Sequence, residues 1–132
     1  MPVETHRFEV ATRGGSHVVD LTDSVRKLVR GSVIADGLVN ACVVGSTAGI
    51  TTTEFEPGLA TRDLAAAFER LAPRDGEYLH ERTWHDDNGH SHVCASVLGP
   101  SITVPLSRGE LVLGTWQQIV LIDFDTRPRQ RT

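Results

Sequence analysis

The sequence predicts one α+β domain, 1–132, in which mostly antiparallel, sandwich-like sheets carry two short helices. The chain has 132 residues, close to the commonest size of a single domain. Segments with the two-residue alternation of strands predominate, and only two segments have helical periodicity. The links between strands in the second half are short, so neighbouring strands must pair antiparallel. No glycine-rich phosphate loop is present, which argues against a doubly wound nucleotide-binding fold.

The first half of the chain predicts four strands and one helix. Phe8 and Val10 alternate with charged residues, as in a half-buried strand. A helix is expected over 24–30, because Val25, Leu28 and Val29 form one apolar face. The four strands are expected at 5–12, 18–21, 38–44 and 48–53.

The second half predicts a helix followed by four strands. The helix is expected over 62–72, where an apolar stripe has helical spacing and Pro73 follows the end. Gly109 supplies the residue that a tight hairpin turn needs between the last two strands. The four strands are expected at 77–82, 90–98, 102–106 and 111–124.

Composition and charge narrow the class of protein. The net charge is −4 and the pI is near 5.8, which argues against nucleic acid as a partner. Arg127, Arg129 and Arg131 form the one basic cluster, which is expected to be a solvated tail. No segment is long and apolar enough for a membrane span, and no signal peptide is evident, so we expect a cytoplasmic protein. In such a protein we expect Cys42 to be a free thiol in the core and Cys94 to be a small packing residue.

Four of the six histidines lie between residues 80 and 92. On a strand, His90 and His92 would project together, about 7 Å apart, with Cys94 on the same face. Val93, Ala95 and Val97 would form the opposite, buried face. A histidine-rich but purely solvated surface is the alternative, and the number of titratable groups favours a functional site.

These histidines predict a site for a divalent metal ion, zinc or magnesium. His90 and His92 come from one strand, and His80 or His85 can supply the third imidazole. Asp86 and Asp87 can orient the ligands, act as a base or hold magnesium through water. The spacing alone is a weak signal, so the metal stays one alternative beside a metal-free site.

Two further features carry weaker signals by themselves. Glu54 ends a threonine-rich strand at a bend, where an exposed carboxylate is the simplest interpretation. Trp116 beside Gln117 can stack on a heteroaromatic ring and hydrogen-bond it, or can be a core tryptophan. Without further information, the core interpretation of Trp116 is favoured.

Several motifs together resemble the YjbQ-like secondary thiamine-phosphate synthase family. The resemblance covers about residues 9–129, and its most specific element is the Leu-Gly-Thr-Trp-Gln-Gln-Ile segment at 113–119. The segments 46–51, 54–58 and 98–101 resemble further blocks of that family, and so do Tyr78-Leu79-His80 and the aspartate-rich run that ends at His92. The chain departs from the family at Gly45, where many members have histidine, and at Thr53, where they often have asparagine.

The resemblance implies a homotrimer with a polar cleft and a small phosphorylated substrate. The implied reaction joins a hydroxymethylpyrimidine pyrophosphate to a thiazole phosphate and releases pyrophosphate. By position, the catalytic candidates are Glu54 and Asp87, the substrate-binding candidates are Thr115, Trp116 and Gln117, and the metal candidates are His80, His85, His90 and His92. The alternatives are a metal-dependent phosphate-ester hydrolase and a non-catalytic trimeric protein that binds a metal or ligand.

Overall fold

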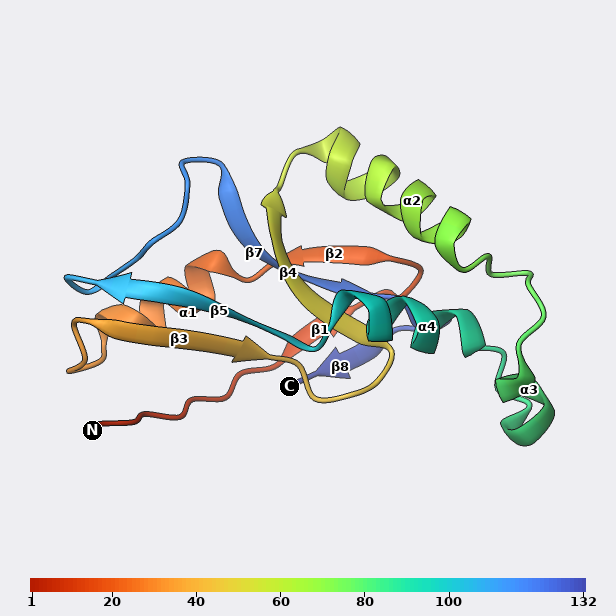
Figure 1. The fold of residues 1–132 in the computed structure, drawn as a ribbon, viewed down its shortest axis with the longest axis horizontal. Helices are drawn as coiled ribbons and strands as arrows, with labels where there is room; N and C mark the ends of the chain where they lie inside the picture. The colour runs from red at the N-terminus through yellow and green to blue at the C-terminus, as the bar shows by residue number, and fades with distance from the viewer.

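The computed structural model describes all of residues 1–132 and contains three small antiparallel sheets (Figure 1). In the central sheet, β7 (Gln117–Asp123) lies between β2 (His17–Asp20) and β4 (Ala48–Glu54). A second sheet contains β3 (Gly37–Cys42), β5 (Ser101–Ser107) and β6 (Glu110–Leu111). The third pairs β1 (Val10–Thr12) with β8 (Arg129–Arg131). The predicted α+β class with antiparallel pairing is confirmed.

Five helical segments complete the fold. They are α1 (Thr22–Arg30), the π-helical turn η1 (Leu59–Asp63), α2 (Leu64–Leu71), α3 (Leu79–Trp84) and α4 (Gly89–Leu98). The predicted helix at 24–30 is therefore confirmed, and the one at 62–72 corresponds to η1 and α2. None of these helices has the length and apolarity that crossing a membrane requires.

Strand β7 is the centre of the core because both of its faces are covered. Ile119 and Leu121 face one apolar cluster, which includes residues of α1 and the second sheet. Val120 and Ile122 alternate with them and face a second cluster, to which α4 contributes. A strand that is buried on both faces needs a continuous apolar run, and β7 has one.

The region 77–98 differs most from the sequence prediction, because both predicted strands are helices. In α4, Ser91, Cys94 and Ala95 are buried at helical spacing, whereas Val93 and Val97 are exposed. The valines that suggested a buried strand face therefore point to solvent. Small residues occupy the buried face because α4 lies close against β4, where a Cβ on Gly49 would be 2.7 Å from the Gly99 carbonyl oxygen. Cys94 is the packing residue predicted.

Smaller corrections concern the ends of the strands and two side chains. The first strand covers only 10–12, and the predicted strand 111–124 is divided by a turn at 112–116 into β6 and β7. Cys42 is exposed rather than part of the core, because it lies on the outer face of β3. Trp116 is exposed in the same turn, so the core interpretation is wrong.

The arginine-rich C-terminus is a strand anchored by buried charges, and the prediction of a solvated tail is wrong. Arg131 is buried, and its guanidinium donates to Asp123 at 2.7 Å and to Thr47 at 2.7 Å. Arg129 donates to the buried Asp125 at 2.7 Å. Arg131 and these two aspartates bind β8 to the end of β7, which ordinary charge-pattern reasoning did not anticipate.

Candidate functional site

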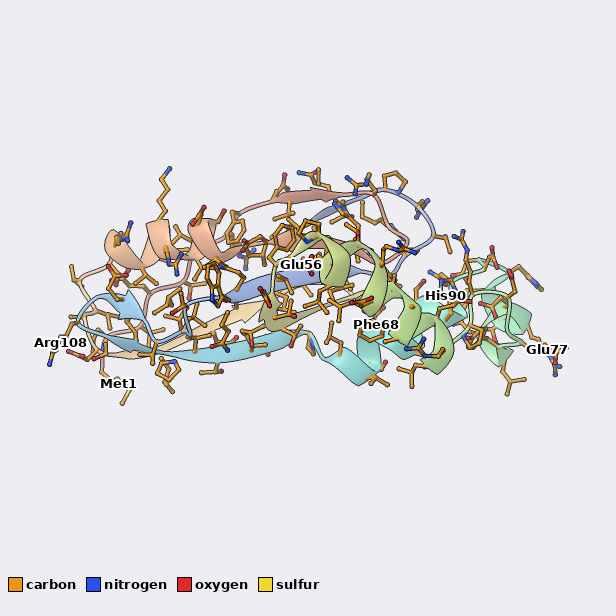
Figure 2. All side chains as sticks on the ribbon, turned by 90° about the horizontal axis from the view of Figure 1, so that it is seen from above. Met1, Glu56, Phe68, Glu77, His90 and Arg108 are labelled. Carbon is orange, nitrogen blue, oxygen red and sulfur yellow. The ribbon has the colours of Figure 1, made fainter.

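The histidine-rich run folds into a helical lobe, defined here as residues 74–92, at one end of the molecule. Figure 2 shows Glu77 and His90 at this end, with Arg108 at the other. The helices approach closely at Gly89, where a Cβ would lie 2.5 Å from the Cβ of Tyr78. Glu81 of α3 accepts the backbone N–H of Gly89, which is the first residue of α4. Glycine is therefore required where the lobe is most tightly packed.

The loop 85–88 between α3 and α4 has unusual backbone geometry. His85 and Asp87 both adopt left-handed conformations, with φ of 55° and 59°. Such conformations cost energy in residues other than glycine, and they concentrate at functional sites. Between them, Asp86 is directed towards His80.

Two of the four predicted histidines lie together in the lobe. The ring centroids of His80 and His92 are 4.5 Å apart, one ring from α3 and the other from α4. Nε2 of His80 lies 3.0 Å from an oxygen of Asp86. The amide of Asn88 is best oriented with its nitrogen towards Asp86, to whose two oxygens it donates at 3.0 and 3.2 Å. Asp86 is thus held by two neighbours, and it fixes the orientation of His80.

His85 and His90 do not join this pair. Residues two apart lie on one side of a strand but on nearly opposite sides of a helix, so His90 faces away from His92. The His90 ring lies beside Tyr78, at a centroid distance of 6.4 Å, and its Nε2 is 3.2 Å from the hydroxyl of Ser91. Partial burial, aided by the positive charge of Arg74, lowers the pKa of His90. His85 is exposed and directly follows Trp84, the last residue of α3.

The donor set of a single chain does not match the predicted metal site. No three histidine, cysteine, aspartate or glutamate side chains converge as ligands for one ion. The nearest approach to such a set is His80 with His92, and Nε2 of His80 already faces Asp86 and Asn88. A catalytic zinc ion takes three protein ligands, and the residues of one chain therefore do not fit it.

A polar cavity of about 390 Å³ opens on the same lobe, although neither histidine of the pair lines it. Arg74 and Arg82 line it together with Tyr78 and three carboxylates, those of Glu77, Glu81 and the predicted catalytic residue Asp87. Neither arginine forms an ion pair within the chain. Two unpaired guanidinium groups beside a cavity can bind a phosphate group.

The remaining predicted residues lie at a different place, which we call the tryptophan edge (Asp20, Glu54, Phe55, Glu56 and Trp116). Glu54 ends β4 and pairs in register with Gln117, the first residue of β7. The five residues line a shallow cavity of about 300 Å³ together with Pro57 and Gln118. Three carboxylates and two exposed aromatic rings thus share one concave surface.

Gln117 holds the turn rather than facing the cavity. Its side-chain oxygen accepts the backbone N–H of Gly114 at 2.9 Å, and its nitrogen donates to the Thr52 hydroxyl at 3.0 Å. Both ends of this amide are therefore occupied within the chain. Thr115 and Trp116 lie in the turn that Gln117 fixes, and both are exposed. Gln118, which the sequence reasoning did not select, lines the cavity instead.

The lobe and the tryptophan edge are at opposite ends of β7. Ser91 of α4 donates a hydrogen bond to the carbonyl of Phe124, just beyond the last residue of β7. The tryptophan edge lies at Gln117, seven residues before Phe124. At about 3.3 Å per residue, the two ends are about 20 Å apart.

Sequence reasoning missed Arg74, Arg82 and Asn88. Arg82 lies within the histidine-rich run but was not selected, and Arg74 precedes that run; the structure places both arginines in one cavity with Asp87. Asn88 had an available signal, since asparagine is among the residues that commonly stand immediately before the first residue of a helix.

Comparison with known proteins gives a consistent result. The family model described as UPF0047 protein YjbQ-like matches residues 6–132. A UPF0047 protein of Mycobacterium tuberculosis H37Rv is 42% identical over 110 residues, which are 82% of this chain and 78% of that protein. One from Archaeoglobus fulgidus is 38% identical over 114 residues, 86% of this chain and 85% of that protein.

Solved structures agree with the fold. A YbjQ-like protein of unknown function from Sulfolobus solfataricus superposes with a TM-score of 0.83 at 31% identity, covering 94% of this chain and 91% of that one. An uncharacterised YjbQ/UPF0047 protein from Clostridium acetobutylicum gives 0.81 at 32% identity, covering 96% and 97%.

Proposed function

Because the chain belongs to the UPF0047 YjbQ-like family, we propose that it is a transferase of the thiamine-phosphate synthase type. In this reaction the ring nitrogen of a thiazole phosphate attacks the methylene carbon of a hydroxymethylpyrimidine pyrophosphate. A carbon–nitrogen bond forms, the bond between that carbon and the pyrophosphate oxygen breaks, and pyrophosphate leaves. No oxidant, reductant or covalent enzyme intermediate is needed.

The observation that carries the proposal is that His80 and His92 pair on the same helical lobe that carries a cavity lined by Arg74 and Arg82. The difficult step is departure of pyrophosphate, on which negative charge develops. Donors that are already in position stabilise such charge most effectively. Arg74 and Arg82 are suited to bind the phosphate groups, and a ring N–H of His80 or His92 to donate a hydrogen bond to the leaving oxygen.

Asp86 positions the His80 ring of the histidine pair for donation to the leaving oxygen. Its carboxylate accepts from Asn88 and lies 3.0 Å from His80 Nε2, so it holds the His80 ring in one orientation. Asp87 lines the cavity with the two arginines, where it can contribute the carboxylate expected of a catalytic residue.

The tryptophan edge is suited to the heterocycle rather than to the phosphates. Trp116 presents an exposed ring on which a pyrimidine can stack, and Glu54 can accept a hydrogen bond from an exocyclic amine. Thr115 lies beside Trp116 with a free hydroxyl, whereas Gln117 acts by holding their turn. Unlike the lobe cavity, this one has no cation in its lining that could bind a phosphate group.

The test is to incubate purified protein with both substrates and to measure thiamine phosphate and released pyrophosphate. His80→Ala and His92→Ala should each lower the rate about 10²- to 10⁴-fold, as the loss of a positioned proton donor does. Thr83→Ala, an exposed change on the same helix as His80, is the matched control and should retain the rate. The absence of both products with the wild-type protein would overturn the proposal.

The same experiment separates the alternatives. Release of inorganic phosphate from a simple phosphate ester, without coupling, would indicate the hydrolase. Substrate binding without either release would indicate a non-catalytic binding protein. Repeating the assay in chelator, and then with added magnesium or zinc, tests the predicted divalent ion, for which further ligands must come from outside the single chain.

A further inference from the structure

The two groups of predicted site residues cannot act together within one chain. Reacting atoms must approach to about 3–3.5 Å, so the side chains that act on them must reach a common point. His80 and His92 lie beyond one end of β7, and Glu54 lies at the other. A histidine and a glutamate side chain together cannot close a gap of about 20 Å.

We infer that the working site is shared between two copies of the chain, the helical lobe of one meeting the tryptophan edge of the next. The inference rests on the proposed function, because that function requires both groups of residues at one place. It also explains why neither cavity is complete: the lobe lacks a third metal ligand, and the edge lacks a cation.

Exposed apolar side chains occur on both surfaces. The chain has two tryptophans, and both are exposed, Trp84 on the lobe at 69% and Trp116 on the edge at 72%. Phe55 lines the same cavity as Trp116, and on the lobe Leu79 is exposed at the other end of α3 from Trp84. Large apolar side chains that gather on a surface mark sites of protein contact. Tryptophan is also the residue most enriched at the energetic centre of interfaces.

The lobe has the cations that the edge lacks. Arg74 and Arg82 of the lobe form no ion pair within their own chain, although Glu77, Glu81 and Asp87 line the same cavity. Asp20, Glu54 and Glu56 of the edge also lack a cationic partner. Contact between copies would bring unpaired guanidinium groups to unpaired carboxylates, which favours this orientation.

The geometry also determines the kind of assembly. The lobe and the edge are different surfaces, so their contact is heterologous and is satisfied throughout only in a closed ring. A ring of three, which the sequence resemblance implies, contains three equivalent shared sites. Each chain then gives its lobe to one site and its edge to another.

Mixing two defective variants tests the shared site directly. His92→Ala damages the lobe, and Glu54→Gln damages the edge. The two proteins are mixed in equal amounts, unfolded and refolded together, and assayed for pyrophosphate release. Random assembly combines an intact lobe with an intact edge in about a quarter of the sites, so about a quarter of the wild-type activity should return. Activity that stays at the average of the two parents would overturn the inference.

A cross-linking experiment keeps the test independent of activity. All variants carry Cys42→Ser, because Cys42 is exposed and would react. Leu79→Cys on the lobe is mixed with Thr115→Cys on the edge, and Lys27→Cys on α1 replaces Thr115→Cys in the control. Mild oxidation should give a disulfide-linked dimer from the first mixture only, and neither variant alone should give one.

The combined outcomes separate the two proposals. Cross-linking between lobe and edge in a protein without coupling activity would leave the shared surface supported and the proposed reaction wrong. Coupling activity without complementation and without the cross-link would support the reaction and place the site within one chain.

Discussion

The end of β8 and the helical lobe are both rich in charged groups, but they use them in opposite ways. Around β8, Asp123, Asp125 and Arg131 are buried and bind one another. In the lobe, Arg74 and Arg82 are exposed and unpaired beside a cavity. Buried, fully paired charges hold a fold together, whereas accessible, unpaired charges remain available to a ligand or a second chain. Burial and pairing, rather than residue type, separate a structural cluster from a functional one.

The largest expected effect comes from breaking the buried cluster. Arg131→Met should lower the free energy of unfolding by about 3–5 kcal/mol, because it leaves Asp123 buried without its partner. Arg127→Met is the matched control, since Arg127 is exposed and should change stability by less than about 0.5 kcal/mol. Urea unfolding of both variants measures the difference. Equal effects would mean that the C-terminus is the solvated tail after all.

Ser91 and His92 of α4 allow the same comparison, between a buried structural residue and an accessible candidate, within the lobe. Ser91→Ala should cost about 1–3 kcal/mol, because the Phe124 carbonyl that accepts the serine hydroxyl becomes unpaired. His92→Ala should cost less than about 1 kcal/mol, because His92 is only partly buried and no backbone group depends on it. Thermal and urea unfolding, both in chelator, would measure this pair. A larger loss for His92→Ala would assign the histidine to the structure rather than to chemistry.

Acid should weaken the buried cluster specifically. Burial alone raises the pKa of Asp123, but hydrogen bonds from Arg131 and Thr12 outweigh it, so the pKa lies below its ordinary value. For the same reason, hydrogen bonds that include one from Arg129 outweigh burial and lower the pKa of Asp125. A carboxyl whose pKa is lowered by folding contributes stability above its unfolded pKa of about 3.9, and this contribution is lost as pH falls through the folded value.

Stability measured from pH 5 downwards should therefore fall more steeply in the wild type than in Asp125→Asn. Asp75→Asn, on the exposed link before α3, should leave the slope unchanged. Identical slopes in all three proteins would show that Asp125 has an ordinary pKa in the folded state.

The smallest effect on stability is expected at Val93. A strand at 90–98 would bury this side chain, whereas the helix α4 exposes it. On the exposed face of α4, Val93→Ala removes little buried surface and raises helix propensity, so stability should change by less than about 1 kcal/mol. Val25→Ala in α1 is the control, because Val25 is buried in the core and should cost about 1–3 kcal/mol. A similar loss at both positions would favour the strand.

Local pattern was sufficient where each element's own residues determine its structure. The helix at 24–30 and the strands at 48–53 and 102–106 follow from apolar periodicity, and the structure confirms them. The hairpin is confirmed as well: β5 and β6 join through Arg108 and Gly109, which both have positive φ, as a two-residue turn demands.

Only the tertiary structure decided how the candidate site residues are grouped. Alternation of Val93, Ala95 and Val97 suggested a strand, but close packing against β4 favours a helix whose buried face consists of small residues. Side chains repeat about every 3.6 residues on a helix instead of every two on a strand. This difference separates His90 from His92 and brings His92 to His80. Likewise, Arg131 is buried because β8 pairs with β1, a partner about 120 residues earlier in the chain. Composition and spacing determine which groups are present, whereas long-range packing determines which of them meet.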